Sequence, residues 1–405
     1  RSWTEDPMQV IVEEAHKRGL AVYPWVWAFC AGFGKPGPVL ERHPEWAELN
    51  RDGGKQSPRG DTFWLQASRP EVRKWLVDVY VDLVTRYEVE GLHLDYIRYE
   101  DEAVASFGYS PYTREAFKKE YGKDPIGFMK YTDDYQAWNA WREKQVTSLV
   151  AEAVRRVHQV RPGLVISAAV MPDLFDARRS KMQNWKHWAD NKYVAYVKPM
   201  IYTEHMDTFR RLAREGRALL EDHALSYPGI YVYNRDQVMS QIQAARELGV
   251  LGICVFSTLH MPQELYGQLA QGPFRTPASM PHADPYGGAV ALLRELNNRV
   301  QVVIDGGGIT ITAASALLDA VEEAEDKLRD AAAGEEPDVK LIQEALEKML
   351  EAKSIAEKAA ANGLLKPEAL KRIDEDLGRI TSLVRFGLYQ ATEVPYQEPS
   401  PAPEG

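Results

Sequence analysis

One stretch of the sequence has a carboxylate at the carboxyl end of a predicted strand, the position of catalytic groups in parallel α/β enzymes. It reads GLHLDYIRY and covers residues 91–99. Alternation along a strand puts His93 and Asp95 on one face and the aliphatic side chains on the other. Asp95 then points inward at the carboxyl end of its strand. Because an unpaired buried charge is costly, Asp95 needs either a function or a partner, and a structural ion pair with Arg98 is the alternative to catalysis.

A second stretch, KPMIYTEH at residues 198–205, supplies another acid. Met200, Tyr202 and Glu204 share one face by the same alternation. If the two stretches are the fourth and sixth strands of a barrel, Asp95 and Glu204 face each other across its mouth. Paired carboxylates carry out glycoside hydrolysis, in which one protonates the leaving oxygen and the other attacks the sugar or activates water. We predict that Asp95 and Glu204 are catalytic, with exchangeable roles and either stereochemical outcome.

Aromatic side chains gather around the same predicted strand ends. Flat rings with a polar edge suit sugars, which present C–H faces and hydroxyl rims. Core packing is the alternative for Trp25, and helix packing is expected for Trp185 and Trp188. The predicted substrate-binding residues are Trp25, Trp27, Trp64, His93, Tyr96, Arg98, Tyr99, Met200, Tyr202 and Tyr233.

The remaining acids are expected to have other roles. Asp133 and Asp134 have the position of helix-start residues. Solvated loop positions are predicted for Glu100, Asp101, Asp173 and Asp176.

Other chemistries find little support in the sequence. The histidines are scattered, without an i,i+4 pair or a His-Glu-x-x-His run, so we predict no metal site and no cofactor. A G-x-S-x-G elbow is absent as well. Cys30 and Cys254 are too few for a disulfide framework and are expected to be free, buried thiols.

Alternating strand and helix patterns predict an α/β fold. Six apolar segments have strand character, at residues 20–29, 89–99, 164–171, 193–203, 227–234 and 250–257. Amphipathic helical runs at residues 6–18, 71–87, 138–160 and 235–248 separate them. An open doubly wound sheet is the alternative to a barrel. Its nucleotide-binding form needs a Gly-rich phosphate loop after a strand, and no predicted strand is followed by one. We therefore predict a (β/α)8 barrel without its first two strands, whose visible strands are the third to the eighth.

Composition changes along the chain and divides it. Residues 1–271 hold the barrel pattern, residues 272–288 form a Pro- and Gly-rich linker, and residues 289–393 repeat apolar residues at heptad-like spacing. A helical bundle is expected there, followed by a disordered tail at residues 394–405. Across all 405 residues the net charge is -10, which disfavours nucleic acid as a partner. No apolar run has the length of a membrane span.

The motifs together resemble those of the glycosyl-hydrolase-like family 10 proteins. The similar segments are WLQ at 64–66, PEVR at 70–73, RYEVEGLHLDYIRY at 86–99, WNAWR at 138–142, QNW at 183–185 with Trp188, and KPMIY at 198–202. They extend from Asp6 to about Met261. The resemblance implies a TIM-type barrel, hydrolysis of O-glycosyl bonds in a polysaccharide or bacterial cell-wall glycan, and a place in the cell envelope or outside the cell.

Carried over residue by residue, the resemblance assigns the family's strand-four acid to Asp95 and its arginine to Arg98. The family often has Pro after the Arg-Tyr pair, where this chain has Glu100. A catalytically silent glycan-binding barrel with a helical spacer remains the alternative, and a lyase or deacetylase barrel is a third.

Overall fold

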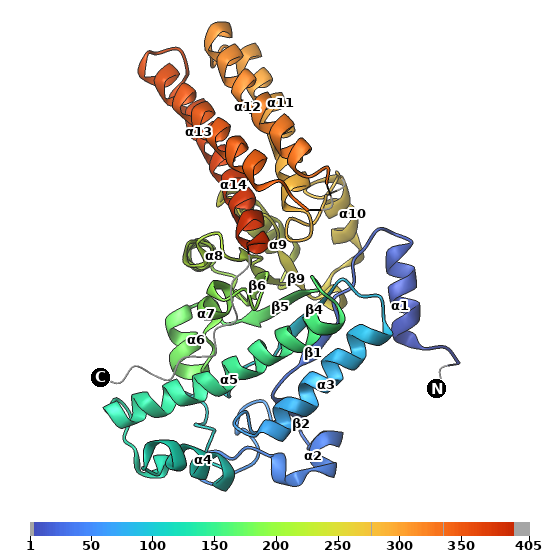
Figure 1. Ribbon diagram of the computed structural model, residues 1–405, viewed down its shortest axis with the longest axis vertical. Coiled ribbons are helices and arrows are strands. Elements are labelled where there is room, and N and C mark those ends of the chain that lie inside the picture. The colour runs from blue at the N-terminus through green and yellow to red at the C-terminus, as the bar shows by residue number, and fades with distance from the viewer. Residues whose placement is uncertain (1–3, 277, 335, 393–405) are drawn as a thin grey trace. The chain divides into compact units, whose positions relative to one another are not determined.

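A computed structural model describes residues 4–276, 278–334 and 336–392. The expected tail at residues 394–405 lies outside these ranges. The chain divides into two compact units, one ending at Ile201 and the other beginning at Tyr202 (Figure 1). Asp95 therefore belongs to the first unit, and Glu204 belongs to the second.

The first unit is a mixed α/β structure with a parallel sheet. Strands β1, β4, β5 and β6 hydrogen-bond in that order, and all three pairings are parallel. Helices α3 and α5 pack together and run side by side across the sheet (Figure 1). The elements are α1 (Pro7–His16), β1 (Trp25–Trp27), β2 (Cys30–Phe33), α2 (Pro38–Arg42), η1 (Pro44–Trp46), β3 (Thr62–Trp64), α3 (Pro70–Arg86), β4 (Gly91–Asp95), α4 (Pro111–Tyr121), η2 (Pro125–Gly127), α5 (Asp133–Val160), β5 (Val165–Val170), α6 (Leu174–Lys181), α7 (Trp185–Asp190) and β6 (Tyr196–Pro199).

The second unit joins a short parallel strand pair to four long helices. Strands β8 and β9 pair in parallel. Helix α11 packs against α12 and α14, and α13 packs against the same two helices. The elements are α8 (Met206–Leu220), β7 (Leu225–Ser226), β8 (Gly229–Tyr231), α9 (Arg235–Glu247), β9 (Cys254–Phe256), η3 (Thr258–His260), α10 (Gln263–Gln271), α11 (Pro285–Asp305), α12 (Ile311–Ala331), α13 (Val339–Ala361) and α14 (Pro367–Ala391).

Each predicted strand segment contains an observed strand, but the observed strands are shorter. The segment at residues 20–29 keeps only Trp25–Trp27 as β1. Before it, the Val22 N–H donates to the Glu90 carboxylate at 2.6 Å. Pro24 has no N–H to give to a neighbouring strand. The ladder therefore becomes regular only from Trp25.

One antiparallel strand pair that matters for the site was not predicted. Strands β2 and β3 pair between Cys30 and Trp64 and between Phe33 and Thr62. This pair follows directly from β1 and returns the chain past the carboxyl end of β4. As a result, Phe33 comes next to Trp27 and Tyr96.

The tryptophans of the molecule are concentrated in its first unit. The sequence places all ten at or before Trp188, and all except Trp3 are described. Trp185 and Trp188 are fully buried. Their indole N–H groups donate to the Met171 carbonyl and the Thr147 hydroxyl. These two residues pack helix α7, as predicted.

Candidate functional site

Asp95 is the last residue of β4, and two hydrogen bonds fix its carboxylate. The Trp25 indole N–H donates to Oδ2 at 2.9 Å, and the Tyr96 backbone N–H donates to Oδ1 at 2.6 Å. Tyr96 has a φ of 49°, in the left-handed region that non-glycine residues seldom occupy. Such strained backbone clusters at functional sites. The turn after β4 thus holds Asp95 in one orientation at the carboxyl edge of the sheet.

The surroundings of Asp95 change its acidity. Its side chain is nearly buried, and this burial raises the pKa of the carboxyl above its ordinary value. The bonds from Tyr96 and Trp25 and the charge of Arg98 act in the opposite direction without reversing the shift. A shift in this direction keeps more of the Asp95 carboxyl protonated at a given pH than in an ordinary aspartate. A buried carboxyl with a perturbed pKa at a strand end makes Asp95 a candidate for an acid–base or nucleophilic group.

Arg98 does not form the ion pair that was the structural alternative for Asp95. No ion pair within the described ranges joins the two residues, and Arg98 donates to the Tyr99 carbonyl at 3.2 Å. Its guanidinium lies 5.4 Å from the Trp64 ring centre and 5.1 Å from that of Tyr96. Arg98 is thus held by aromatic faces, and its charge reaches Asp95 only through space.

Exposed aromatic rings lie beside Asp95 and the residue that follows it, Tyr96. Trp27 lies 5.9 Å from Trp25, 5.3 Å from Tyr96 and 5.1 Å from Phe33, measured between ring centres. Trp25 is 50% exposed, Trp27 40% and Phe33 44%. Large aromatics that stay exposed beside a buried acid form a surface on which a sugar ring can stack. Phe33 was not predicted, because its position depends on the missed β2–β3 pair.

His93 precedes Asp95 by two residues in β4, so the two side chains lie on the same face of the sheet. Its Nδ1 lies 2.9 Å from the Ser167 hydroxyl of β5. Burial, aided by the charge of Lys198, lowers the pKa of His93 well below its usual range. The imidazole is therefore neutral. The buried His93 side chain therefore packs inside the sheet next to Ser167 and is not exposed at the surface.

Trp64 and Tyr99 need a correction, because both were predicted to contact substrate. Trp64 is 2% exposed and Tyr99 is 3% exposed. The Trp64 indole donates to the Thr62 hydroxyl at 3.0 Å, and its ring packs near Tyr96. A ring enclosed on both faces cannot stack on a sugar, so these two residues pack the site and do not line it.

The acids after β4 also differ from the prediction of solvated loop positions. Glu100 is buried and accepts a 3.0 Å hydrogen bond from the Thr62 hydroxyl. Asp101 forms an ion pair with the largely buried Lys181 of α6. Glu100 follows Tyr99 where the family often has Pro, and here its carboxylate helps to build the turn. The loop acids are therefore structural members of the first unit.

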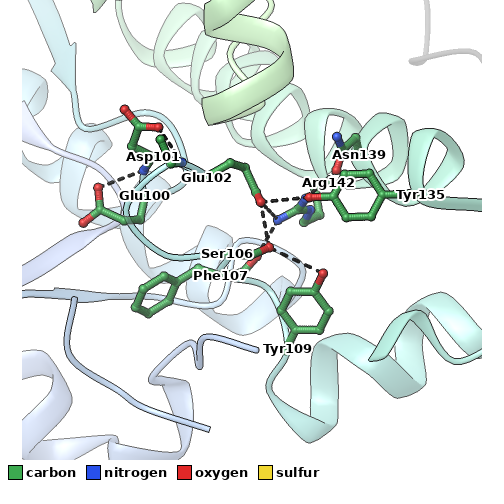
Figure 2. A network of polar contacts seen from close by, with 10 residues as sticks. Glu100, Asp101, Glu102, Ser106, Phe107, Tyr109, Tyr135, Asn139 and Arg142 are labelled. Carbon is green, nitrogen blue, oxygen red and sulfur yellow. Dashed lines mark hydrogen bonds and ion pairs between the residues drawn. The ribbon is translucent and has the colours of Figure 1, made fainter. Parts of the chain in front are cut away.

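Sequence reasoning passed over Glu102, which is the centre of a buried network (Figure 2). Its carboxylate lies 2.6 Å from the fully buried Arg142 guanidinium of α5. The Ser106 and Tyr135 hydroxyls donate to it at 3.0 and 2.8 Å. Arg142 also donates to the Phe107 carbonyl and the Asn139 side chain. The network ties the loop after β4 to helix α5.

Other predicted acids fall at helix starts. Asp133 and Asp134 open α5, as expected. Asp173 is the N-cap of α6, where its carboxylate accepts from the Asp176 N–H at 2.9 Å. Asp176 itself stays exposed in the first turn.

The remaining site predictions concern residues around the boundary of the units. Met200 is half-buried and its N–H donates to the Val170 carbonyl. In the second unit, Tyr202 stacks on Phe256 with 5.6 Å between ring centres, and its carbonyl accepts from the Tyr233 hydroxyl at 3.1 Å. Glu204 is exposed, 3.5 Å from the Asn234 amide. The pairing of Glu204 with Asp95 across a barrel mouth stays a prediction.

No group of three or more His, Cys, Asp or Glu side chains among the described residues could hold a metal ion. None of the described helices is long and apolar enough to cross a membrane. Cys30 and Cys254 are not joined by a disulfide bond; Cys30 is buried and Cys254 is half-buried. Burial raises the pKa of the Cys30 thiol to about 11.

Comparison with known proteins identifies the family. The model of the Glycosyl hydrolase-like 10 family matches residues 2–217, more than half of the chain. The chain belongs to this family. The match covers the whole Asp95 site and includes Glu204, and it ends before the four long helices.

Two curated relatives carry the name glycosyl hydrolase. Glycosyl hydrolase DigH of Escherichia coli K12 is 26% identical over 219 residues, which cover 49% of this chain and 46% of DigH. Glycosyl hydrolase YngK of Bacillus subtilis is 22% identical over 219 residues, covering 49% of this chain and 39% of YngK. The chain thus spans less than half the length of these relatives.

Solved structures show weaker similarity. A GH36 α-galactosidase, AgaA of Geobacillus stearothermophilus, aligns with a TM-score of 0.41 at 10% identity, over 65% of this chain and 32% of that one. A hypothetical protein of Ruminiclostridium thermocellum aligns with a TM-score of 0.27 at 16% identity, over 43% and 70%.

Proposed function

We propose that this chain is the catalytic part of a glycoside hydrolase that acts on a polysaccharide or a bacterial cell-wall glycan. The observation that carries the proposal is the Asp95 carboxyl, buried and oriented at the end of β4 beside the exposed rings of Trp25 and Trp27. The family and the names of its relatives support the same chemistry.

Asp95 is the nucleophile or general base in this mechanism. The aromatic rings stack on the sugar and bring its anomeric carbon to the carboxylate. Glu204 is proposed as the second acid, which protonates the leaving oxygen. Arg98, Tyr96 and Tyr202 position the sugar.

The architecture proposed for this function is an incomplete barrel. Strands β1, β4, β5, β6, β8 and β9 correspond to the third to eighth barrel strands, with the loops at their carboxyl ends forming the site. Helices α11 to α14 form a bundle that acts as a spacer. By resemblance, the protein works in the cell envelope or outside the cell.

Product analysis tests the proposal. The protein, in its longest natural form, is incubated with a panel of glycans that includes peptide-free cell-wall strands, and mass spectrometry detects new oligosaccharides. Asp95→Asn should abolish the products while the circular dichroism spectrum stays unchanged. Asp52→Asn, an exposed acid far along the chain from β4, serves as the matched control. Full turnover by Asp95→Asn would remove Asp95 from the mechanism.

A catalytically silent glycan-binding barrel is the second candidate. The observation that favours it is that both Asp95 oxygens already accept a hydrogen bond, as a purely structural carboxylate would. Such a protein would bind one of the glycans and release no new reducing ends over a long incubation.

A further inference from the structure

A second aromatic surface lies on the first unit, outside the Asp95 site. Tyr131, just before α5, is 77% exposed, and Phe175, in the first turn of α6, is 72% exposed. The Arg179 guanidinium lies 5.6 Å from the Tyr131 ring centre and 5.8 Å from that of Phe175. We call these three side chains the α6 platform.

The charge of the platform is not neutralised by the protein. The other two basic side chains of α6 have carboxylate partners, since Arg178 pairs with Glu143 and Lys181 pairs with Asp101. Arg179 makes no ion pair with any residue in the described ranges. A guanidinium that is held between two exposed rings offers its N–H fork to a carboxylate of a ligand.

The platform lies at the same edge of the sheet as Asp95. Strands β4 and β5 are parallel, so their carboxyl ends meet at one edge. Helix α6 begins four residues after Val170, the last residue of β5. The first turn of α6, which carries Phe175, therefore lies at the same edge of the sheet as Asp95.

Direct contacts tie the platform to the loop that follows Asp95. The Tyr99 N–H donates to the Lys181 carbonyl, and the Glu102 N–H donates to the Ser180 carbonyl. The Asp101–Lys181 ion pair joins the same two segments. At 1.5 Å per helical residue, Phe175 lies about 9 Å along α6 from this junction. Hydrogen bonds and an ion pair thus connect helix α6, which carries Phe175 and Arg179, to the loop that follows Asp95.

We propose that the α6 platform is a second glycan-binding subsite, which holds a part of the chain away from the bond that is cleaved. Its ligand is a polymeric glycan that carries carboxylates, because the rings stack on sugar faces while Arg179 binds the acid group. This inference rests on the proposed function and extends its substrate to long, anionic chains.

Binding and turnover together test the subsite. The probes are peptide-free cell-wall glycan strands, short oligosaccharides made from them, and the same strands after reduction of their carboxyl groups. In Tyr131→Ala/Phe175→Ala, the dissociation constant for long strands should rise roughly tenfold and that for the short oligosaccharides should stay unchanged. Arg179→Gln should weaken binding of the native strands and leave that of the reduced strands unaltered.

Matched controls are available on the second unit. Val302→Ala in α11 removes a side chain that is 70% exposed, and Arg211→Gln removes an exposed arginine that pairs with Glu215. Both should bind long strands like the unchanged protein.

The outcomes separate the subsite from the proposed function. Unchanged affinity for long strands in both platform variants, with turnover intact, would overturn the subsite alone. Weakened binding in the variants of a protein that releases no products would support the subsite and reject hydrolysis. No binding of any strand by the unchanged protein would overturn both.

Discussion

Asp95 combines features that individually are ordinary. Its burial disfavours the charged form, and the hydrogen bonds from Trp25 and Tyr96 favour it. Strand alternation alone predicted that Asp95 lies on the inner face, because it needs only the two-residue period. The bond from Trp25 could not be predicted, since it depends on the register that pairs Trp25 with His93 and Trp27 with Asp95.

Removing the indole donor should make Asp95 less acidic. In Trp25→Phe the carboxylate loses the 2.9 Å bond that lowers its pKa, so its pKa should rise further above the ordinary value. Carbon-13 NMR of labelled aspartate carboxyls measures this titration without any need for turnover. Trp27→Phe is the control, because no hydrogen bond joins Trp27 to Asp95 within the described residues. An equal midpoint in both variants would show that the indole does not tune the acid.

At the scale of elements, the strands were predictable and the loop chemistry was not. The predicted segments at residues 89–99, 164–171 and 193–203 contain β4, β5 and β6, because short apolar runs bounded by polar residues are typical of buried strands. Glu100, Asp101 and Glu102 look like surface acids in sequence, yet Thr62, Lys181 and Arg142 bring them inside. Their partners come from 38 to 80 residues away, and no local pattern encodes such pairings.

The Glu102–Arg142 pair should control the stability of the first unit. Burial by itself would raise the pKa of Glu102. The charge of Arg142 and the hydrogen bonds from Ser106, Arg142 and Tyr135 together outweigh burial, and the pKa lies below its ordinary value. The stabilisation is therefore present above the ordinary carboxyl pKa and is lost as the pH falls through the lowered one. Glu102→Gln leaves a buried charge unpaired and should cost about 3–5 kcal/mol in urea unfolding at pH 7.

The double variant Glu102→Gln/Arg142→Met is the control for this pair. It removes both charges and should recover much of the loss. Equal stability of the unchanged protein and Glu102→Gln at pH 7 would mean that the pair contributes nothing.

A close backbone approach also limits what β4 can contain. A Cβ on Gly91 would lie 2.2 Å from the Tyr23 ring, so Gly91→Ala should push β4 or the ring aside and destabilise by about 1–3 kcal/mol. Gly378→Ala in α14 meets no atom within 4 Å and should be neutral or stabilising by up to about 1 kcal/mol. Thermal unfolding of the two variants compares them directly, and a loss in Gly378→Ala as large as in Gly91→Ala would contradict the steric argument.

At the scale of the whole molecule, composition predicted where the chain changes character. The shift to Ala, Leu, Glu and Lys after residue 288 falls inside α11, which begins at Pro285 within the predicted linker. Gly306–Gly308 separate α11 from α12, and Asn362–Gly363 follow the end of α13. Composition did not predict that the compact units divide at Tyr202. Contacts across the chain set that boundary, and a window of sequence does not contain them.

Core substitutions in the four helices should act locally. Leu317 of α12 is fully buried, and Leu317→Ala should destabilise its unit by about 2–5 kcal/mol. Hydrogen exchange followed by mass spectrometry should then show faster exchange in residues 285–391 and unchanged protection in strands β4 and β5. Faster exchange spread equally over both regions would show that the units unfold as one.

Because all tryptophans lie in one part of the chain, intrinsic tryptophan fluorescence reports on the first unit alone. Every indole lies at or before Trp188, and among the described tryptophans Trp25 and Trp27, on the strand that pairs with β4, are exposed. Light absorbed at the red edge of the protein spectrum therefore excites only the first unit. A sugar that stacks on the exposed rings would shift the emission to shorter wavelength, so occupancy of the site can be followed by fluorescence in the unmodified protein.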